Sequence, residues 1–193
     1  KLLSKEDLIP ARADKFVFKL APYIIFVPAF LVMAVLPLGP VGGGPNLFGY
    51  RFDYVIANFD SGLVLFLAMG GIAVYGIVLA GWSSNNKYSM MGGLRASAQI
   101  ISYELSMGFA AAATFLVAGS LRLPAVVAWQ QAHVWNVVPQ FVGFLIFLIA
   151  VFAETNRLPF DLAEAETELV AGYHVEYSSM KFALFFLAEY IHM

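Results

Sequence analysis

Six carboxylates gather in one short stretch near the C-terminal end of the chain. They are nearly half of its thirteen acidic residues: Glu154, Asp161, Glu164, Glu166, Glu168 and Glu176. Neighbouring negative charges oppose one another's ionisation, so this cluster favours a site that holds and passes protons. A solvated loop is the plainer alternative, and Asp161 with Glu164 also fits a helix N-cap followed by an acid three residues later. Capping does not explain Glu166 and Glu168.

Two further acids lie inside strongly apolar stretches. Glu104 occurs in SYELSMGFAAAATFLVAG and Glu189 in FALFFLAEYIHM. A charged side chain at the centre of a membrane helix costs about 2.5–3.5 kcal/mol on insertion scales. Neither acid has a cation at helical spacing along its own segment. Each is therefore either protonated and silent at a helix contact, or joins Glu154 in a proton relay that leads between helices to the acidic loop.

The histidines and the missing cysteines limit other chemistry. His133 is expected to be solvated in an outer loop, and His174 could titrate near neutrality, although a structural hydrogen bond is the favoured interpretation. His192 is the only histidine inside an expected span, so a transmembrane haem with two histidine ligands is unsupported. Without cysteine, the chain alone builds no disulfide, thiolate zinc site or iron–sulfur cluster. No metal-ligand spacing, Gly-rich phosphate loop or Ser–His–Asp arrangement is visible.

Composition indicates that lipid is the solvent of most of the chain. Hydrophobic residues make up 61% and charged residues 12%, with a mean hydropathy of +0.77. A soluble domain has about half and about a quarter of these classes. One soluble core of this length could not bury so much apolar surface. The net charge of −2 does not suggest a nucleic-acid partner.

The carboxylates must therefore be positioned by membrane helices. A spanning helix needs about 20 mostly apolar residues. The sequence predicts four complete spans and a fifth that is cut short, over residues 16–38, 61–81, 97–119, 137–154 and 178–193. We expect an all-α, polytopic transmembrane bundle that forms a single integral membrane domain over residues 1–193. Pro22 and Pro28 are expected to bend the first span, and Gly76 is among the glycines expected to allow close helix contact.

Basic residues predict the orientation of this bundle. Five crossings place residues 1–15 and the loops at 82–96 and 155–177 on one side. That side collects nine basic residues: Lys1, Lys5, Arg12, Lys15, Lys19, Lys87, Arg95, Arg157 and Lys181. The other side has only Arg51 and Arg122, together with a turn-rich loop at 41–46. The positive-inside rule makes the first side the cytoplasm, or the matrix of a mitochondrion, so the acidic loop is cytoplasmic.

Two long blocks carry a family resemblance. They are GWSSNNKYSMMGGLRASAQIISYE at 81–104 and ETNRLPFDLAEAETELVAGYHVEYSSMKFALFFLAEY at 154–190. Together they resemble the family of the quinone-site membrane subunit of respiratory complex I, the NADH:quinone oxidoreductase, which is subunit 1 in mitochondria. The similarity extends along the whole chain. Family members have eight or more spans. The chain is therefore expected to be a fragment that covers the second through part of the sixth span, without the first span and its amphipathic helix.

The resemblance implies a role for this chain in the larger complex. Such a subunit joins the redox arm to the membrane arm and, with neighbouring subunits, encloses the chamber where quinone enters from the bilayer. NADH, FMN and the iron–sulfur clusters belong to partner subunits, so no cofactor is expected on this chain. Carried over residue by residue, the proton-channel acids are Glu104, Glu154, Asp161, Glu164, Glu166, Glu168, Glu176 and Glu189, and Arg157 matches an arginine of the quinone chamber. A bacterial inner membrane is the expected location, with the mitochondrial inner membrane as the alternative.

One departure and three alternatives remain open. Some relatives have a glutamate in the second span where this chain has Gly71, so the channel must work without that acid or replace it. The chain could instead serve a related hydrogenase or dehydrogenase complex with another electron donor. A proton-coupled transporter would also carry intramembrane acids, but it should show an internal repeat, and none is visible. A purely structural anchor is the third alternative.

Overall fold

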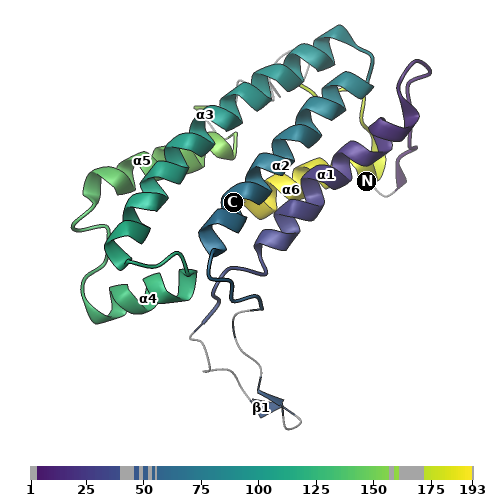
Figure 1. Cartoon of the computed structure of the whole chain (residues 1–193). Coiled ribbons are helices and arrows are strands. Elements are labelled where there is room, and N and C mark those ends of the chain that lie inside the picture. The colour runs from purple at the N-terminus through teal and green to yellow at the C-terminus, as the bar shows by residue number, and fades with distance from the viewer. Residues whose placement is uncertain are drawn as a thin grey trace.

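A computed structural model describes residues 4–39, 46–47, 50–51, 54, 56–156, 159–160 and 172–192. Within these residues the chain forms six helices: α1 (Lys15–Val32), α2 (Gly62–Ser83), α3 (Lys87–Ala118), α4 (Leu123–Ala132), α5 (Phe141–Glu154) and α6 (Ser179–His192) (Figure 1). Two short strands, β1 (Asn46–Leu47) and β2 (Tyr50–Arg51), form an antiparallel pair between α1 and α2. The predicted all-α class is confirmed, with this small hairpin as an unpredicted addition.

The helices are arranged around α2 and α3. α1 packs against α2 and α6, α2 against α3, and α3 against α5, so residues far apart in sequence share the interior (Figure 1). Three helices, α1, α2 and α3, are long and apolar enough to cross a membrane. α5 and α6 have 14 residues each, about 21 Å at 1.5 Å per residue, which is shorter than the roughly 30 Å hydrocarbon core. The predicted count of five crossings therefore stays a prediction.

The prediction of a loop over residues 82–96 is wrong. α2 ends at Ser83 and α3 already begins at Lys87, because the side chain of Asn86 accepts a hydrogen bond from Tyr88 N–H at 3.0 Å and caps the helix. α3 then runs for 32 residues to Gly119, which closes it in the left-handed conformation at φ 66°. At about 48 Å the helix exceeds the roughly 30 Å core of a bilayer, so its polar first turns need no apolar sequence.

Helix α4 lies in the region that the sequence analysis treated as an outer loop. Pro124 lies in its first turn, where a missing N–H costs nothing. Val126 is buried against Leu63 and Phe115, so this short helix covers one end of the α2–α3 pair. His133 follows the helix and is exposed, as expected.

The contact between α1 and α2 depends on one glycine. Asp14 starts α1 by accepting hydrogen bonds from Phe16 N–H and Val17 N–H, and the helix continues through Pro22 and Pro28. A Cβ on Gly76 would collide with the Ile25 side chain. The close helix contact predicted for this glycine is therefore present. α1 ends at Val32, earlier than the predicted residue 38.

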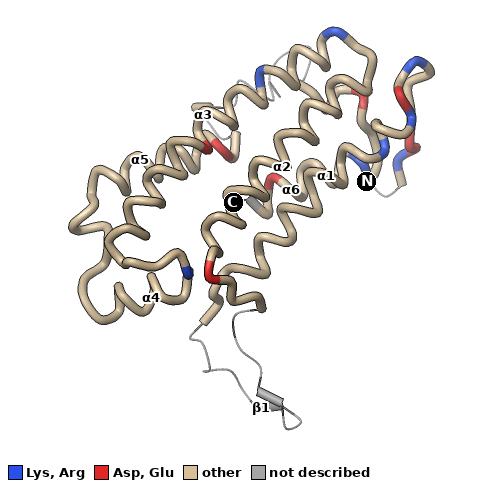
Figure 2. The backbone as a smooth tube through the Cα atoms, viewed as in Figure 1, with Lys and Arg blue, Asp and Glu red and all other residues tan. Residues whose placement is uncertain are grey.

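Three segments meet at one end of the bundle, which we call the basic end. Ser178 Oγ accepts from Leu8 N–H at 3.0 Å, and Asp14 N–H donates to Ser83 O at 3.1 Å. Lys181 Nζ pairs with Asp7 at 2.8 Å. Figure 2 shows most described Lys and Arg at this end, whereas the Arg122–Asp60 pair, at 3.0 Å, lies beside α4. This arrangement agrees with the segregation of charge that the sequence predicts.

Candidate functional site: half-buried carboxylates between α2, α3, α5 and α6

Four of the predicted site residues are described by the structure. Glu104 lies in α3, Glu154 ends α5, Glu189 lies in α6, and Glu176 precedes α6. The other predicted site residues lie outside the described residues: Arg157, Asp161, Glu164, Glu166 and Glu168. The side chain of His192 also lies outside them. The site is therefore built from the helical acids.

Glu104 and Glu154 line the same cavity. It has a volume of about 300 Å³ and lies between α1, α2, α3 and α5. Most of its wall is apolar, with Phe66, Met107 and Phe147 among the lining residues. Both carboxylates therefore face one space that is enclosed mainly by apolar side chains. Two acids that are well separated in the sequence are thus brought to one site.

A glycine in α2 makes room for the Glu104 carboxylate. A Cβ on Gly70 would lie 2.8 Å from Glu104 Oε1, closer than a carbon and an oxygen can approach without displacement. A Cβ on the next residue, Gly71, would lie 3.9 Å from the same oxygen, an ordinary contact distance. Gly71 therefore also lies beside Glu104. Helix α2 contains no Asp or Glu, so it places no second acid beside Glu104.

Glu154 also lines a second, smaller cavity. This cavity has a volume of about 50 Å³, and Gly70, Asn156 and Glu189 line it as well. Its volume exceeds the roughly 30 Å³ that one water occupies in the liquid. Glu154 Oε2 is buried and has no hydrogen-bond partner among the described residues. Glu154 is thus the common wall of two cavities, with Glu104 in one and Glu189 in the other.

Gln99 fixes the end of α5 and was missed by the sequence analysis. Its Nε2 lies 3.2 Å from Ala153 O, 3.0 Å from Asn156 Oδ1 and 2.9 Å from Phe160 O. These contacts hold α3 to the residues on both sides of Glu154. Asn156 has a left-handed φ of 46°, so the chain turns sharply where Gln99 binds it. The available signal was an amide inside SAQIISYE, five residues before Glu104.

Glu176 is not brought into these cavities. Its Oε1 accepts a hydrogen bond from Asn86 Nδ2 at 2.7 Å, at the basic end. It lines a hollow there together with Arg12 and Lys87. Glu176 therefore supports the residue that caps α3, and the structure separates it from the helical acids.

Two other titratable side chains are buried near the basic end. The His174 ring has edge contacts with Tyr173 at 5.2 Å and Phe182 at 5.5 Å, and its burial lowers the pKa of His174 below its ordinary value. The Tyr177 hydroxyl lies 3.3 Å from Ser83 Oγ, and burial raises the pKa of Tyr177 to about 12. Both groups stay neutral near pH 7. Their aromatic surroundings indicate a structural role.

The helical acids have the chemistry of a proton relay. An isolated carboxylate is costly in an apolar cavity, so a proton shared between Glu104 and Glu154 lowers the electrostatic cost of the pair. Water in the cavities could bridge the distances that the side chains do not cover. The same proton could then pass from Glu154 toward Glu189. The arrangement needs no metal ligand, and no group of three or more His, Cys, Asp or Glu able to hold a metal occurs among the described residues.

Comparison with known proteins identifies the wider context. The family model described as NADH dehydrogenase matches residues 1–193. The whole chain is 52% identical to "NADH-quinone oxidoreductase subunit 8" of Thermus thermophilus and covers 51% of it. It is also 52% identical to the protein of the same name in Rhodothermus marinus, covering 54%, and to an NADH-quinone oxidoreductase subunit of Geobacter metallireducens, covering 57%. The chain thus spans about half the length of these relatives.

Proposed function

The chain belongs to the NADH dehydrogenase family, and we propose that it forms part of the membrane subunit of a proton-pumping NADH:quinone oxidoreductase. In this role it contributes to the quinone chamber and to the acidic channel that couples quinone reduction to proton translocation. The observation that carries the proposal is the placement of Glu154 between two cavities that also contain Glu104 and Glu189.

The coupling follows from electrostatics. Reduction of the quinone adds negative charge near the acidic segment 157–171, where Arg157 and the remaining predicted acids occur in the sequence. Unit charges 4 Å apart interact by about 4 kcal/mol at an effective dielectric of 20, which is enough to change the protonation of a carboxylate. A proton drawn toward the quinone is replaced from Glu154, and Glu154 is refilled from Glu104. The acids therefore titrate as a group.

The role implies partners and a location. Redox-arm subunits carry the electrons from NADH through FMN and iron–sulfur clusters, and other membrane-arm subunits continue the proton path. The basic end faces the redox arm on the cytoplasmic side of a bacterial inner membrane. The bacterial origin of the three relatives supports the location, and the gathering of basic residues at that end supports the orientation.

Replacement of Glu104 tests the proposed function. Glu104→Gln keeps the shape and the hydrogen-bonding capacity of the side chain but cannot release and regain a proton. In the assembled complex, reconstituted into vesicles, we expect NADH-driven acidification to fall about tenfold or more. Glu104→Asp retains a titrating group with shorter reach and should keep partial activity. NADH oxidation by an artificial acceptor should be unchanged, since electrons do not pass through this chain.

Asp60→Asn is the matched control. Asp60 is an exposed carboxylate that pairs with Arg122 at the opposite end, where a surface ion pair contributes little. Its acidification rate should match that of the wild type. Unchanged pumping by Glu104→Gln would contradict the relay. A complex that reduces quinone with a donor other than NADH would support the alternative of a related dehydrogenase or hydrogenase.

A further inference from the structure

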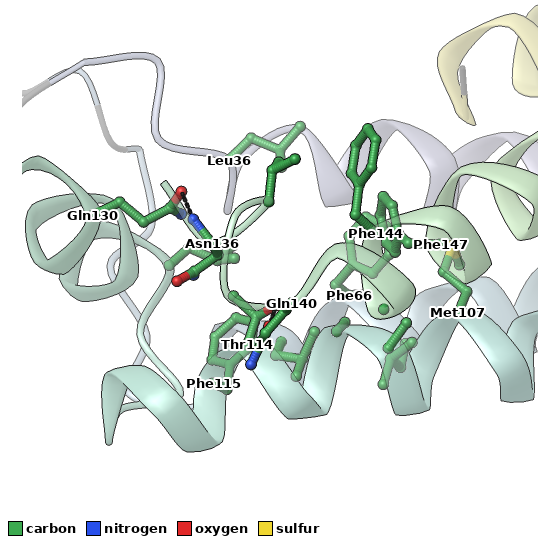
Figure 3. A pocket seen from close by; sticks show the side chains of 17 residues that line it. Leu36, Phe66, Met107, Thr114, Phe115, Gln130, Asn136, Gln140, Phe144 and Phe147 are labelled. Atoms are coloured by element: carbon green, nitrogen blue, oxygen red, sulfur yellow. Dashed lines mark hydrogen bonds between the residues drawn. The ribbon is translucent and has the colours of Figure 1, made fainter. Parts of the chain in front are cut away.

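Another, larger cavity lies beyond the carboxylates, toward α4. It has a volume of about 380 Å³, within the range of about 300–1,000 Å³ typical of small-molecule sites. α2, α3, α5 and the segment around Asn136 enclose it (Figure 3). It shares Phe66, Met107 and Phe147 with the Glu104–Glu154 cavity, so these side chains separate the two spaces. No Glu, Asp, Lys or Arg is among its lining residues.

Most of its few polar side chains already have partners. Thr114 Oγ1 donates to Gln140 Oε1 at 3.0 Å, and Gln140 Nε2 donates to Ala113 O at 2.9 Å. Gln130 Oε1 accepts from the backbone N–H of Asn136 at 3.4 Å. These bonds connect α5 and the Asn136 segment to their neighbours. Few of the polar atoms of Thr114, Gln130 and Gln140 are therefore free to bind a ligand.

Asn136 is the exception. Only 6% of the residue is exposed, yet neither Nδ2 nor Oδ1 has a hydrogen-bond partner among the described residues. A buried amide without partners costs about 1–3 kcal/mol for each unsatisfied group. Figure 3 shows Asn136 at the polar end of the cavity, with Phe144, Phe147 and Met107 toward the other end. One unused donor and one unused acceptor thus stand at the end of an apolar chamber.

We infer that this cavity binds a neutral amphiphile from the bilayer. The head would carry an adjacent hydrogen-bond donor and acceptor, as in a primary amide, and pair with Asn136. The tail would lie against Phe144 and Phe147. An anionic head is disfavoured because the lining supplies no cation. Phe144 and Phe147 of α5 both line the cavity and are 38% exposed, so the ligand has an apolar approach along this helix.

Photolabelling of the complete complex tests this site. The probe is a medium-chain primary fatty amide with a diazirine in its tail, and the comparison probe is the alkane that lacks the head. We expect the amide to label peptides from α3 and α5. Asn136→Leu removes both polar atoms at similar volume and should lower that labelling about tenfold, the loss expected for one or two hydrogen bonds. Labelling by the alkane should be weak and insensitive to the substitution.

Two further variants keep the test decisive. Gly143→Leu fills the cavity without touching Asn136, because a Cβ there meets only Gln140 Cβ at 3.9 Å. It should reduce amide labelling as strongly. Asn58→Leu changes an exposed amide near the start of α2 and should label as the wild type does. Wild-type labelling in Asn136→Leu, equal labelling by both probes, or no labelling of the wild-type cavity would each overturn the proposal.

Discussion

Two regions of the bundle hold titratable side chains that are buried or half-buried, and they differ in access. Glu104 and Glu154 line a cavity of about 300 Å³, and one oxygen of Glu154 has no partner among the described residues. At the basic end, the His174 ring lies among aromatic rings and the Tyr177 hydroxyl is bonded to Ser83. Burial alone therefore does not mark a functional acid. A titratable group can exchange protons only where space for water or another acid adjoins it.

Of the substitutions that test this difference, Gly70→Ala should have the largest effect on proton pumping. The added Cβ would lie 2.8 Å from Glu104 Oε1, so the carboxylate must move from its position in the cavity. We expect NADH-driven pumping to fall about tenfold with assembly intact, because a small displacement of a proton-transfer group is costly. Gly108→Ala is the matched control, since its Cβ meets Leu67 at an ordinary 3.5 Å. Equal rates in the two variants would show that the position of Glu104 is unimportant.

Gln99→Leu should have an intermediate effect. It removes the amide that binds Ala153, Asn156 and Phe160 around the end of α5. The two N–H groups of the amide are shared among these three acceptors, so we expect a loss of about 2–3 kcal/mol in stability and a several-fold loss of quinone reduction. Thermal unfolding and quinone-reductase assays measure the two effects. Ser102→Ala, which removes only an exposed bond to Ala98 O, is the control and should change neither.

His174→Phe should change the pH dependence of stability but not pumping. Because the pKa of His174 is lowered in the folded chain, the unfolded state binds the proton first, from about pH 6.5 downward. The wild type therefore loses stability as the pH falls through that range. The variant should lose less between about pH 6.5 and 5. Parallel melting curves across this range would refute the burial effect, and reduced pumping at pH 7 would place His174 on the proton path.

Tyr177→Phe should have the smallest effect. It removes the contact with Ser83 Oγ, which still lies 3.2 Å from Ala80 O. The stacking on Phe18, at 4.0 Å between ring centroids, is retained. A loss of about 1 kcal/mol in stability is expected, with normal pumping. A clear defect in proton transfer would remove the distinction between the two regions.

The sequence predicted the helical class and the acids, but not how the acids meet. Hydropathy locates apolar helices because lipid demands apolar side chains over a fixed length. It places the start of α3 too late, since the turns after Lys87 need no apolar residues. The shared cavity depends on Gly70 facing Glu104 and on Gln99 holding α5, which are contacts between distant segments. No local pattern encodes such contacts, and the same holds for the amide of Asn136, which has no hydrogen-bond partner among the described residues.

The central claim is that Glu104 and Glu154 act as one proton-transfer unit. It is tested most directly by NADH-driven acidification with Glu104→Gln, Glu154→Gln and the double variant, each normalised to assembled complex. Residues that act as a unit are strongly non-additive. We predict that each single variant pumps poorly and that the double variant is no slower than the slower single one. Wild-type pumping by either single variant, or losses that multiply in the double variant, would contradict the claim.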